Sequence, residues 1–293
     1  MKTTHNVEKV GMANYMRYKR AKVLNMYRYA NLITDTIEPF IKDKDFRKLN
    51  SFLKDKLPSY YISKHEGFKS LAEQWNEKGI VRLSEETSKA RRETDVKPGS
   101  WFKVEDAYSI LESIKKEYDI KKILDPFNGW GARAAGALCL DLEYKGIDLN
   151  PLLQNELKDI FKNNEKVSFE NENSFEYDFS KLNGYDCVFT CPPYWKAEDY
   201  GYRGQFNGTY ESFISELAKL SMNMFKINGM KIVIMSIEDF RVKGKKYSFV
   251  EDYKKAILEK GLECQEIVYS RIKRNFQKDE RDLAYIKVIK NNI

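Results

Sequence analysis

The sequence predicts an α/β protein with a doubly wound, mainly parallel sheet of seven strands that follows a helical N-terminal region. Three observations support this fold class. After Trp101, seven short apolar runs are separated by helical stretches, as in strands joined by crossover helices. The last two runs lack a helix between them, which favours a closing antiparallel hairpin. Between Tyr15 and Lys89, apolar residues recur at helical spacing without strand-like alternation.

Each strand is expected where a short apolar run ends in polar or turn-forming residues. These runs are Lys122–Pro126, Tyr144–Asp148, Val167–Glu170, Asp186–Thr190, Lys231–Ser236, Glu263–Tyr269 and Leu283–Ile289. The clearest helical stretches between them are Pro151–Asn163, Tyr210–Lys226 and Val250–Lys260. In such a sheet, ligands bind beyond the carboxyl ends of the strands. Functional residues are therefore expected at that edge.

The N-terminal region is expected to form a unit of its own. Its pattern fits three or four helices. The polar stretch Ser88–Ser100 contains the pair Pro98-Gly99 and is typical of a linker or an exposed loop. We therefore divide the chain into a helical basic region, residues 1–98, and an α/β domain, residues 99–293.

Composition excludes several classes of protein. The net charge is +7, and the first 100 residues carry 21 Lys and Arg against 13 Asp and Glu. The mean hydropathy is −0.63, and no apolar run is long enough to span a membrane. The N-terminus lacks the apolar segment of a secretion signal, so we expect a cytoplasmic protein. With four Cys, no CxxC pair and two His, neither a disulfide framework nor a metal site is expected.

A glycine turn follows the first predicted strand and precedes a helix. The segment from Asp125 to Arg133 contains Gly129 and Gly131, and glycines at such a turn let a ligand approach the backbone at a helix N-terminus. Asp148 ends the next strand, where a doubly wound fold places a carboxylate against ribose hydroxyls. An ordinary turn and a helix-capping Asp148 are the alternatives. The segment lacks the third glycine of the dinucleotide-binding motif, so a smaller adenosyl cofactor fits better than NAD.

A second motif, Thr190-Cys191-Pro192-Pro193-Tyr194-Trp195, follows the fourth predicted strand. Two prolines remove donors and fix the backbone, so carbonyl oxygens are left as acceptors at the ligand-binding edge. An exocyclic amine of a nucleobase is a weak nucleophile, because its lone pair is delocalised into the ring. Acceptors that hold its hydrogens would align the lone pair with a methyl donor.

The two motifs together resemble those of the S-adenosylmethionine-dependent amino methyltransferases that make N4-methylcytosine or N6-methyladenine in DNA. The longer strings Asp-Pro-Phe-Asn-Gly-Trp-Gly-Ala-Arg, Gly-Ile-Asp-Leu-Asn-Pro and Phe-Thr-Cys-Pro-Pro-Tyr look especially like DNA methylases encoded by bacteriophages. The resemblance extends from about Trp101 to the C-terminus. It implies a Rossmann-like methyltransferase domain, S-adenosylmethionine as cofactor and DNA as partner.

The resemblance also implies roles for individual residues. The cofactor site would comprise Trp101, Phe102, Asp125, Phe127, Gly129, Gly131, Asp148, Asn173 and Ser174. Asn173 and Ser174 stand where the family often has an acidic residue for the adenine amine. The catalytic residues would be Thr190, Cys191, Pro192, Pro193 and Tyr194, with the ring of Tyr194 stacking on the base.

Cys191 departs from the family, which usually has Ser, Asp or Asn at this position. Sulfur accepts hydrogen bonds weakly, so Thr190 and Pro192 would hold the amine. The simplest interpretation is a small residue tolerated at a Ser position. Alternatively, a thiolate adds to a pyrimidine ring and activates its carbon for methylation.

Several residues are candidates for contact with the substrate. Trp195 follows the catalytic motif, and the loop after it contains Tyr202 and Arg203. A basic segment between the last two strands contains Arg271, Lys273 and Arg274. In the N-terminal region, tyrosines and basic residues alternate between Tyr15 and Tyr29, a mixture that can contact phosphates and bases. Each of these segments could instead be an ordinary solvated surface.

The sequence thus predicts transfer of a methyl group to cytosine N4 or adenine N6 in DNA. An RNA or small-molecule methyltransferase, a pyrimidine-carbon methyltransferase using Cys191, and an inactive nucleic-acid-binding relative are the alternatives. Neither the target base nor the oligomeric state follows from the sequence.

Overall fold

The computed structural model describes residues 36–57, 101–197, 206–267 and 284–290. Within these ranges, the first elements are the helices α2 (Glu38–Lys42) and α3 (Phe46–Lys56). The elements that follow are α7 (Val104–Tyr118), β1 (Lys122–Asp125), α8 (Ala132–Leu138), β2 (Glu143–Asp148), α9 (Pro151–Ile160), β3 (Val167–Asn171), the 3₁₀ helix η1 (Phe179–Lys181), β4 (Cys187–Thr190), α10 (Tyr210–Met224), β5 (Ile232–Ile237), β6 (Phe240–Val242), β7 (Lys245–Tyr247), α11 (Phe249–Glu259), β8 (Leu262–Ile267) and β9 (Ala284–Lys290). None of the helices in these ranges is long and apolar enough to cross a membrane.

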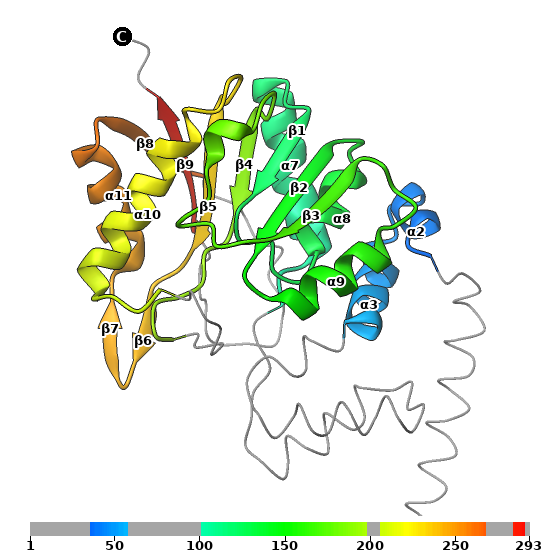
Figure 1. Cartoon of the computed structure of the whole chain (residues 1–293), viewed down its shortest axis with the longest axis horizontal. Coiled ribbons are helices and arrows are strands. Elements are labelled where there is room, and N and C mark those ends of the chain that lie inside the picture. Colours follow the sequence, from blue (N-terminus) through cyan, green and yellow to red (C-terminus); the bar gives the residue numbers. More distant parts are fainter. Residues whose placement is uncertain (1–35, 58–100, 198–205, 268–283, 291–293) are drawn as a thin grey trace, which may run out of the picture.

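Seven strands form one sheet in the order β3-β2-β1-β4-β5-β9-β8 (Figure 1). The first five are parallel to one another, and β9 runs antiparallel to both β5 and β8. The predicted fold class and its closing antiparallel pair are therefore confirmed. All seven predicted strands are present, with bounds that differ by one or two residues. The order reverses between β1 and β4, which places a ligand-binding crevice at their carboxyl ends.

The sheet is covered by helices on both faces (Figure 1). Successive strand residues point to opposite sides, so along β4 the side chains of Cys187 and Phe189 join one core cluster while that of Val188 joins the other. Helices α7, α8 and α9 contribute to the first cluster, and α10 and α11 to the second. Burial on both faces explains why the central strands β4 and β5 are continuous apolar runs instead of alternating ones.

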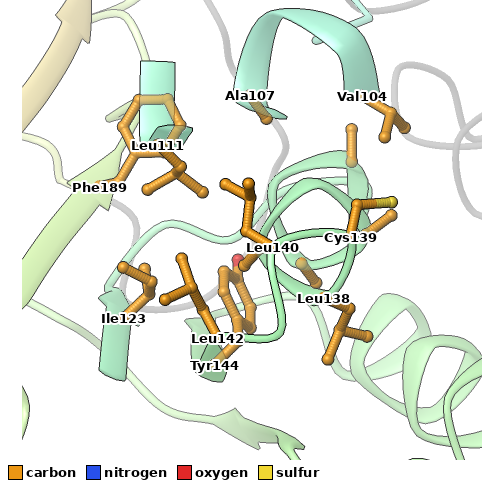
Figure 2. Packing of buried hydrophobic residues seen from close by; sticks show 14 of the residues in the cluster. Val104, Ala107, Leu111, Ile123, Leu138, Cys139, Leu140, Leu142, Tyr144 and Phe189 are labelled. Carbon is orange, nitrogen blue, oxygen red and sulfur yellow. The ribbon is translucent and has the colours of Figure 1, made fainter. Parts of the chain in front are cut away.

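Helix α7 was not predicted, although its apolar residues follow a helical period. Val104, Ala107 and Leu111 are fully buried in the first core cluster, which also contains Leu140 and Tyr144 (Figure 2). The two helices approach closely at Gly136, where an added Cβ would lie 2.8 Å from the Cβ of Ala107. This contact fixes α8, the helix that begins at the glycine turn.

The described part of the N-terminal region belongs to the first core cluster. Leu49, Phe52 and Leu53 of α3 are at most 3% exposed and share that cluster with residues of α7, α8 and α9. Ile37 and Leu57, on either side, are also fully buried. These helices therefore pack on the α/β domain. The division at residues 98 and 99 stays a prediction, and the other predicted N-terminal helices lie outside the described residues.

A two-stranded hairpin, β6–β7, was not predicted. It follows β5 and projects from the sheet (Figure 1). Its turn residues, Lys243 and Gly244, both have positive φ, 48° and 84°, as a type I′ turn requires. The sequence signal was weak because Lys-Gly is a less common pair for this turn than Asn-Gly or Asp-Gly.

Candidate active site

A cavity of about 190 Å³ lies at the carboxyl edge of the sheet. Its walls come from the segments that follow β1, β2, β3, β4 and β5, and from Trp101 and Phe102 before α7. The cavity therefore lies at the topological switch point of the sheet, where a doubly wound fold binds its ligands.

The glycine turn forms one wall of the cavity. Gly129 lines it and has a φ of 50°, and Gly131, which precedes α8, has a φ of 79°. A Cβ on Gly131 would lie 2.6 Å from the Cδ2 atom of Leu157 on α9, so a larger residue would force this buried side chain to move. Gly131 itself does not line the cavity. It allows the turn to pack closely on α9, whereas Gly129 exposes backbone to a ligand.

Asp148 lines the same cavity at the end of β2. Its two carboxylate oxygens accept hydrogen bonds from the amides of Gly129 at 3.3 Å and Asn150 at 3.0 Å. Burial raises the pKa of Asp148 to about 6, although both amide contacts favour the ionised form. A carboxylate that is poorly hydrated and faces a cavity is suited to accept hydrogen bonds from ligand hydroxyls.

Asp125 is fully buried and does not line the cavity. Its Oδ2 accepts hydrogen bonds at 2.6 Å from the Nε of Arg133 and from the hydroxyl of Tyr144. Its Oδ1 accepts a hydrogen bond at 2.6 Å from the Thr190 hydroxyl. Asp125 thus ties together β1, β2, β4 and α8 at the edge where the cavity opens. It acts on the cavity through these neighbours.

Arg133 also lines the cavity, although the sequence predicted no role for it. Burial alone would lower its pKa, but Asp125 beside it raises that pKa above the ordinary value. Its guanidinium carbon lies 5.1 Å from the ring centre of Phe102. The only sequence signal was an arginine on the first turn after the glycines, and which carboxylate it meets depends on the fold.

Thr190 is also fully buried and outside the cavity wall. Besides donating to Asp125, its hydroxyl oxygen accepts a hydrogen bond from the amide of Phe127 at 3.2 Å. This hydroxyl joins the end of β4 to the glycine turn. Its observed contacts thus hold the two motifs together.

The rest of the predicted catalytic segment borders the cavity. Cys191, Pro192, Pro193 and Tyr194 all line it. Tyr194 is 9% exposed, and the rings of Phe240 and Phe249 pack against it at 5.5 and 5.8 Å between ring centres. The structure thus brings this segment and the glycine turn to one cavity.

Trp195 lies beyond this cavity in a neighbouring aromatic cluster. Its ring contacts those of Tyr210 and Tyr247, and its Nε1 donates to the carbonyl oxygen of Gly208 at 2.9 Å. It lines a second, shallower hollow next to the first.

Phe127, Asn173 and Ser174, which were predicted to bind the cofactor, also line the cavity. Asn173 accepts a hydrogen bond from the amide of Phe175 at 3.1 Å, and the Ser174 hydroxyl donates to the carbonyl oxygen of Pro126. Phe127 packs against Phe175, with 5.4 Å between ring centres. These contacts join the segments after β1 and β3 into one wall.

Trp101 and Phe102 line the cavity and are held from two directions. The Nε1 of Trp101 donates to the Oδ1 of Asn50 on α3 at 2.8 Å, and the ring of Phe102 contacts Phe189 on β4. Asn50 also accepts from the amide of Val104 at 3.2 Å. A residue of the N-terminal region therefore positions this wall, and no local pattern in the sequence predicted it.

Two carboxylates that the sequence analysis did not single out, Glu172 and Glu238, also line the cavity. They follow β3 and β5, so the rule that ligands bind at strand ends could have identified them. The predicted substrate residues Tyr202, Arg203, Arg271, Lys273 and Arg274 lie outside the described residues. Within the described part of the chain, no group of three or more His, Cys, Asp and Glu could hold a metal ion.

No protein-family model matches the chain, and a search of curated proteins found no match. Solved structures are similar to it at low identity. The methyltransferase domain of bacterial CtHen1-CN is 15% identical, with a TM-score of 0.43 over 64% of this chain and 100% of that one. An S-adenosylmethionine-dependent methyltransferase from Clostridium acetobutylicum is 13% identical, with a TM-score of 0.43 over 64% of this chain and 92% of that one.

A third structure, fibrillarin from Aeropyrum pernix in complex with S-adenosylmethionine, is 14% identical, with a TM-score of 0.40 over 62% of this chain and 76% of that one.

Proposed function

We propose that the protein transfers a methyl group from S-adenosylmethionine to an exocyclic amino group of a base in DNA, cytosine N4 or adenine N6. One observation carries this proposal. The glycine turn with Asp148 and the segment from Cys191 to Tyr194 line the same cavity. A methyl donor held by the first and an amine held by the second would therefore meet within one enclosed space.

The residues on the first side fit an adenosyl cofactor. Asp148 offers carboxylate oxygens to ribose hydroxyls, and Gly129 lets the ligand lie close to the backbone. Trp101 and Phe102 would cover the methionine end beside Arg133. When bound there, S-adenosylmethionine supplies an electrophilic methyl group.

The residues on the second side fit a planar base that carries an amine. The carbonyl oxygen of Pro192 accepts an amine hydrogen, which reduces delocalisation of the nitrogen lone pair into the ring. Pro193 fixes the backbone at that carbonyl, because its ring restricts φ. The ring of Tyr194, supported by Phe240 and Phe249, stacks on the base.

DNA is proposed as the substrate on two grounds. The motif pair resembles that of DNA amino methyltransferases, and the first hundred residues carry the net positive charge, with 21 Lys and Arg against 13 Asp and Glu, while the rest of the chain is nearly neutral. A base inside a duplex must leave the stack to enter the cavity, which costs a few kcal/mol, and stacking on Tyr194 would offset part of this cost.

The test is transfer of labelled methyl from S-adenosylmethionine to unmodified DNA, followed by mass spectrometry of the nucleosides. We expect N4-methylcytosine or N6-methyladenine from the full chain. Tyr194→Ala should lower turnover far more than cofactor affinity, and Tyr194→Phe, which keeps the ring, should retain most of the activity. Equal loss of turnover and cofactor affinity in Tyr194→Ala would contradict the stacking role. If the chain binds S-adenosylmethionine but no label appears in DNA, RNA is the next substrate to test. If RNA is not labelled either, the result would favour an inactive nucleic-acid-binding protein.

Cys191→Ser separates amine methylation from carbon methylation in the same assay. If the thiol only lines the cavity, serine at this position should retain turnover within about tenfold, since the family commonly has serine there. A mechanism in which the thiolate attacks the pyrimidine would lose essentially all turnover. Complete loss of activity, together with a methyl group on a pyrimidine carbon, would replace the proposed reaction by the carbon mechanism.

A further inference from the structure

The β6–β7 hairpin concentrates positive charge beside the catalytic segment. Its eight residues, from Phe240 to Tyr247, include four exposed cations and no anion. The cations are Arg241, Lys243, Lys245 and Lys246. By contrast, residues 101–293 as a whole contain nearly equal numbers of acidic and basic residues. The charge of the hairpin is therefore a local feature.

The hairpin is held rigidly. The rings of Phe240 and Tyr247 stack across it with 5.4 Å between their centres and an angle of 15° between their planes. The Nη1 of Arg241 donates to the carbonyl oxygen of Gly244 at 3.1 Å, which closes the turn. A rigid hairpin loses little conformational entropy when it binds a partner.

The base of the hairpin is joined to the catalytic segment. Phe240 contacts Tyr194 with 5.5 Å between ring centres, and Tyr247 contacts Trp195 with 5.3 Å. Tyr210, the first residue of α10, lies 4.6 Å from Tyr247 by the same measure. The position of the cations is thus set relative to the base-binding side of the cavity.

A shallow groove lies between the hairpin and the residues after the catalytic motif. We call it the hairpin groove; it is lined by Trp195, Lys196, residues 207–211, Lys245 and Tyr247. The Nζ of Lys196 lies 4.9 Å from the ring centre of Trp195, and the Nζ of Lys245 lies 4.9 Å from that of Tyr247. Cations beside half-buried rings are suited to a nucleic-acid strand, since it presents phosphates and bases together. Glu211 is the one acidic residue among these lining residues.

Within the described ranges, one of the four hairpin cations has a carboxylate partner. Lys246 forms an ion pair with Asp239 at 2.9 Å. Among the residues that the structure describes, no carboxylate pairs with Arg241, Lys243 or Lys245. Arg241 and Lys245 also contact Gly244 and Tyr247 of the hairpin, but these contacts leave their charges without a counter-ion, which phosphates would supply.

We propose that the hairpin and the hairpin groove bind the phosphate backbone of the DNA strand that carries the target base, next to the base itself. This inference rests on the proposed function and adds to it the surface that receives the polymer. The hairpin cations contact phosphates, while Trp195 and Tyr247 border the neighbouring base.

The test compares two triple variants of the full chain. The hairpin variant is Arg241→Gln, Lys243→Gln, Lys245→Gln. The control variant, Lys162→Gln, Lys226→Gln, Lys260→Gln, makes the same charge change at exposed lysines that follow the C-terminal ends of α9, α10 and α11, at the opposite edge of the sheet. Affinity for a labelled single-stranded DNA of about 20 nucleotides is measured by fluorescence anisotropy at several salt concentrations, and affinity for S-adenosylmethionine by calorimetry.

Three lost phosphate contacts should reduce the slope of log K against log salt by about 2 for a single strand. If these contacts contribute nothing at about 1 M salt, the DNA affinity at about 0.1 M salt falls about a hundredfold. The control variant should bind DNA as the unmodified chain does. Both variants should keep the unmodified affinity for S-adenosylmethionine, which shows that they are folded. Arg241→Lys, Lys243→Arg, Lys245→Arg should retain DNA binding, because the charge is kept.

DNA binding that is unchanged in the hairpin variant would overturn the inference and leave the proposed function standing. If the unmodified chain binds an RNA strand of the same sequence better than DNA, DNA is not the occupant. If the unmodified chain binds S-adenosylmethionine but no nucleic acid, the proposed polymer substrate fails together with the inference.

Discussion

At the scale of single residues, two opposing effects act on the pKa of Asp148. Its surroundings remove water and so raise its pKa to about 6, and the nearby carboxylate of Asp125 adds to this effect while Arg133 opposes it. The amides of Gly129 and Asn150 hold its oxygens in place. A ligand that donates hydroxyl hydrogens would supply the hydrogen bonds that water no longer provides.

Cofactor affinity should depend on pH through Asp148. In the proposed complex, ribose hydroxyls would donate to the ionised carboxylate, so a proton would have to leave before the cofactor binds well. Affinity for S-adenosylmethionine is therefore full above about pH 7 and weakens as pH falls through about 6, by up to about tenfold per pH unit. Asp148→Asn should bind about 10- to 100-fold more weakly at neutral pH, and its affinity should be flat from about pH 5 to about pH 8. Calorimetry over this range tests both statements, and a flat profile for the unmodified chain would contradict them.

Asp125 supports the cavity through its ion pair with Arg133 and does not line the cavity itself. Asp125 is fully buried, and Arg133 is 4% exposed. Buried charges are costly unless each hydrogen bond is made, and here Tyr144 and Thr190 complete the set around the carboxylate. The aspartate that the motif begins with thus organises the strand ends on which the cavity is built.

At the scale of secondary-structure elements, α3 is an integral part of the site. Asn50 on this helix accepts from Trp101 and from the amide of Val104, and donates to the Glu105 side chain at 2.7 Å. It therefore fixes both the cavity wall and the start of α7. The helix is amphipathic, and its buried side, including Leu53, faces the glycine turn.

Asn50→Ala should weaken cofactor binding because it frees the ring of Trp101. It also leaves part-buried partners without hydrogen bonds, so the free energy of unfolding should fall by about 1–3 kcal/mol. Calorimetry with S-adenosylmethionine and thermal unfolding measure the two effects. Ser51→Ala, at the adjacent and exposed position of the same helix, is the matched control and should change neither. An Asn50→Ala chain with unaltered cofactor affinity would show that Trp101 needs no support from α3.

At the scale of the whole molecule, the described N-terminal helices and the sheet share one core. Six apolar residues between Ile37 and Leu57 are at most 6% exposed. Burying a large apolar side chain stabilises a protein by about 1.5–3 kcal/mol, so these six contribute on the order of 10 kcal/mol. Whole domains are stable by about 5–15 kcal/mol. This contribution is therefore comparable with the entire stability of the fold.

A chain that begins at residue 99 should consequently lose its cooperative thermal transition and expose apolar surface to hydrophobic dyes. A chain that begins at residue 36 keeps α2 and α3 and should unfold cooperatively. Circular dichroism melts and dye binding distinguish the two. If the shorter chain unfolds cooperatively and binds S-adenosylmethionine as tightly as the full chain, the predicted division at residues 98 and 99 marks an independent domain.

The sequence by itself determined the fold class, the order of the seven strands along the chain and the two motifs of the cavity. These features are encoded locally: apolar runs predict buried strands, the glycines after Asp125 permit a turn with positive φ, and the prolines after Cys191 restrict φ. Because the carboxyl ends of parallel strands lie at one edge of a sheet, the sequence also predicted that Asp148 and the segment Pro192-Pro193 lie near one another.

Only the tertiary structure decided which distant side chains meet. Arg133 pairs with Asp125, Asn50 holds Trp101, and Tyr247 of the hairpin packs against Trp195. None of these pairs is marked by a local period, because each results from how the helices and the hairpin pack on the sheet. The hairpin was not predicted for the same reason. Its short strands are stabilised by aromatic contacts with Tyr194 and Tyr210, which lie outside the hairpin. The segment from Phe240 to Tyr247 therefore carries little local signal of its own.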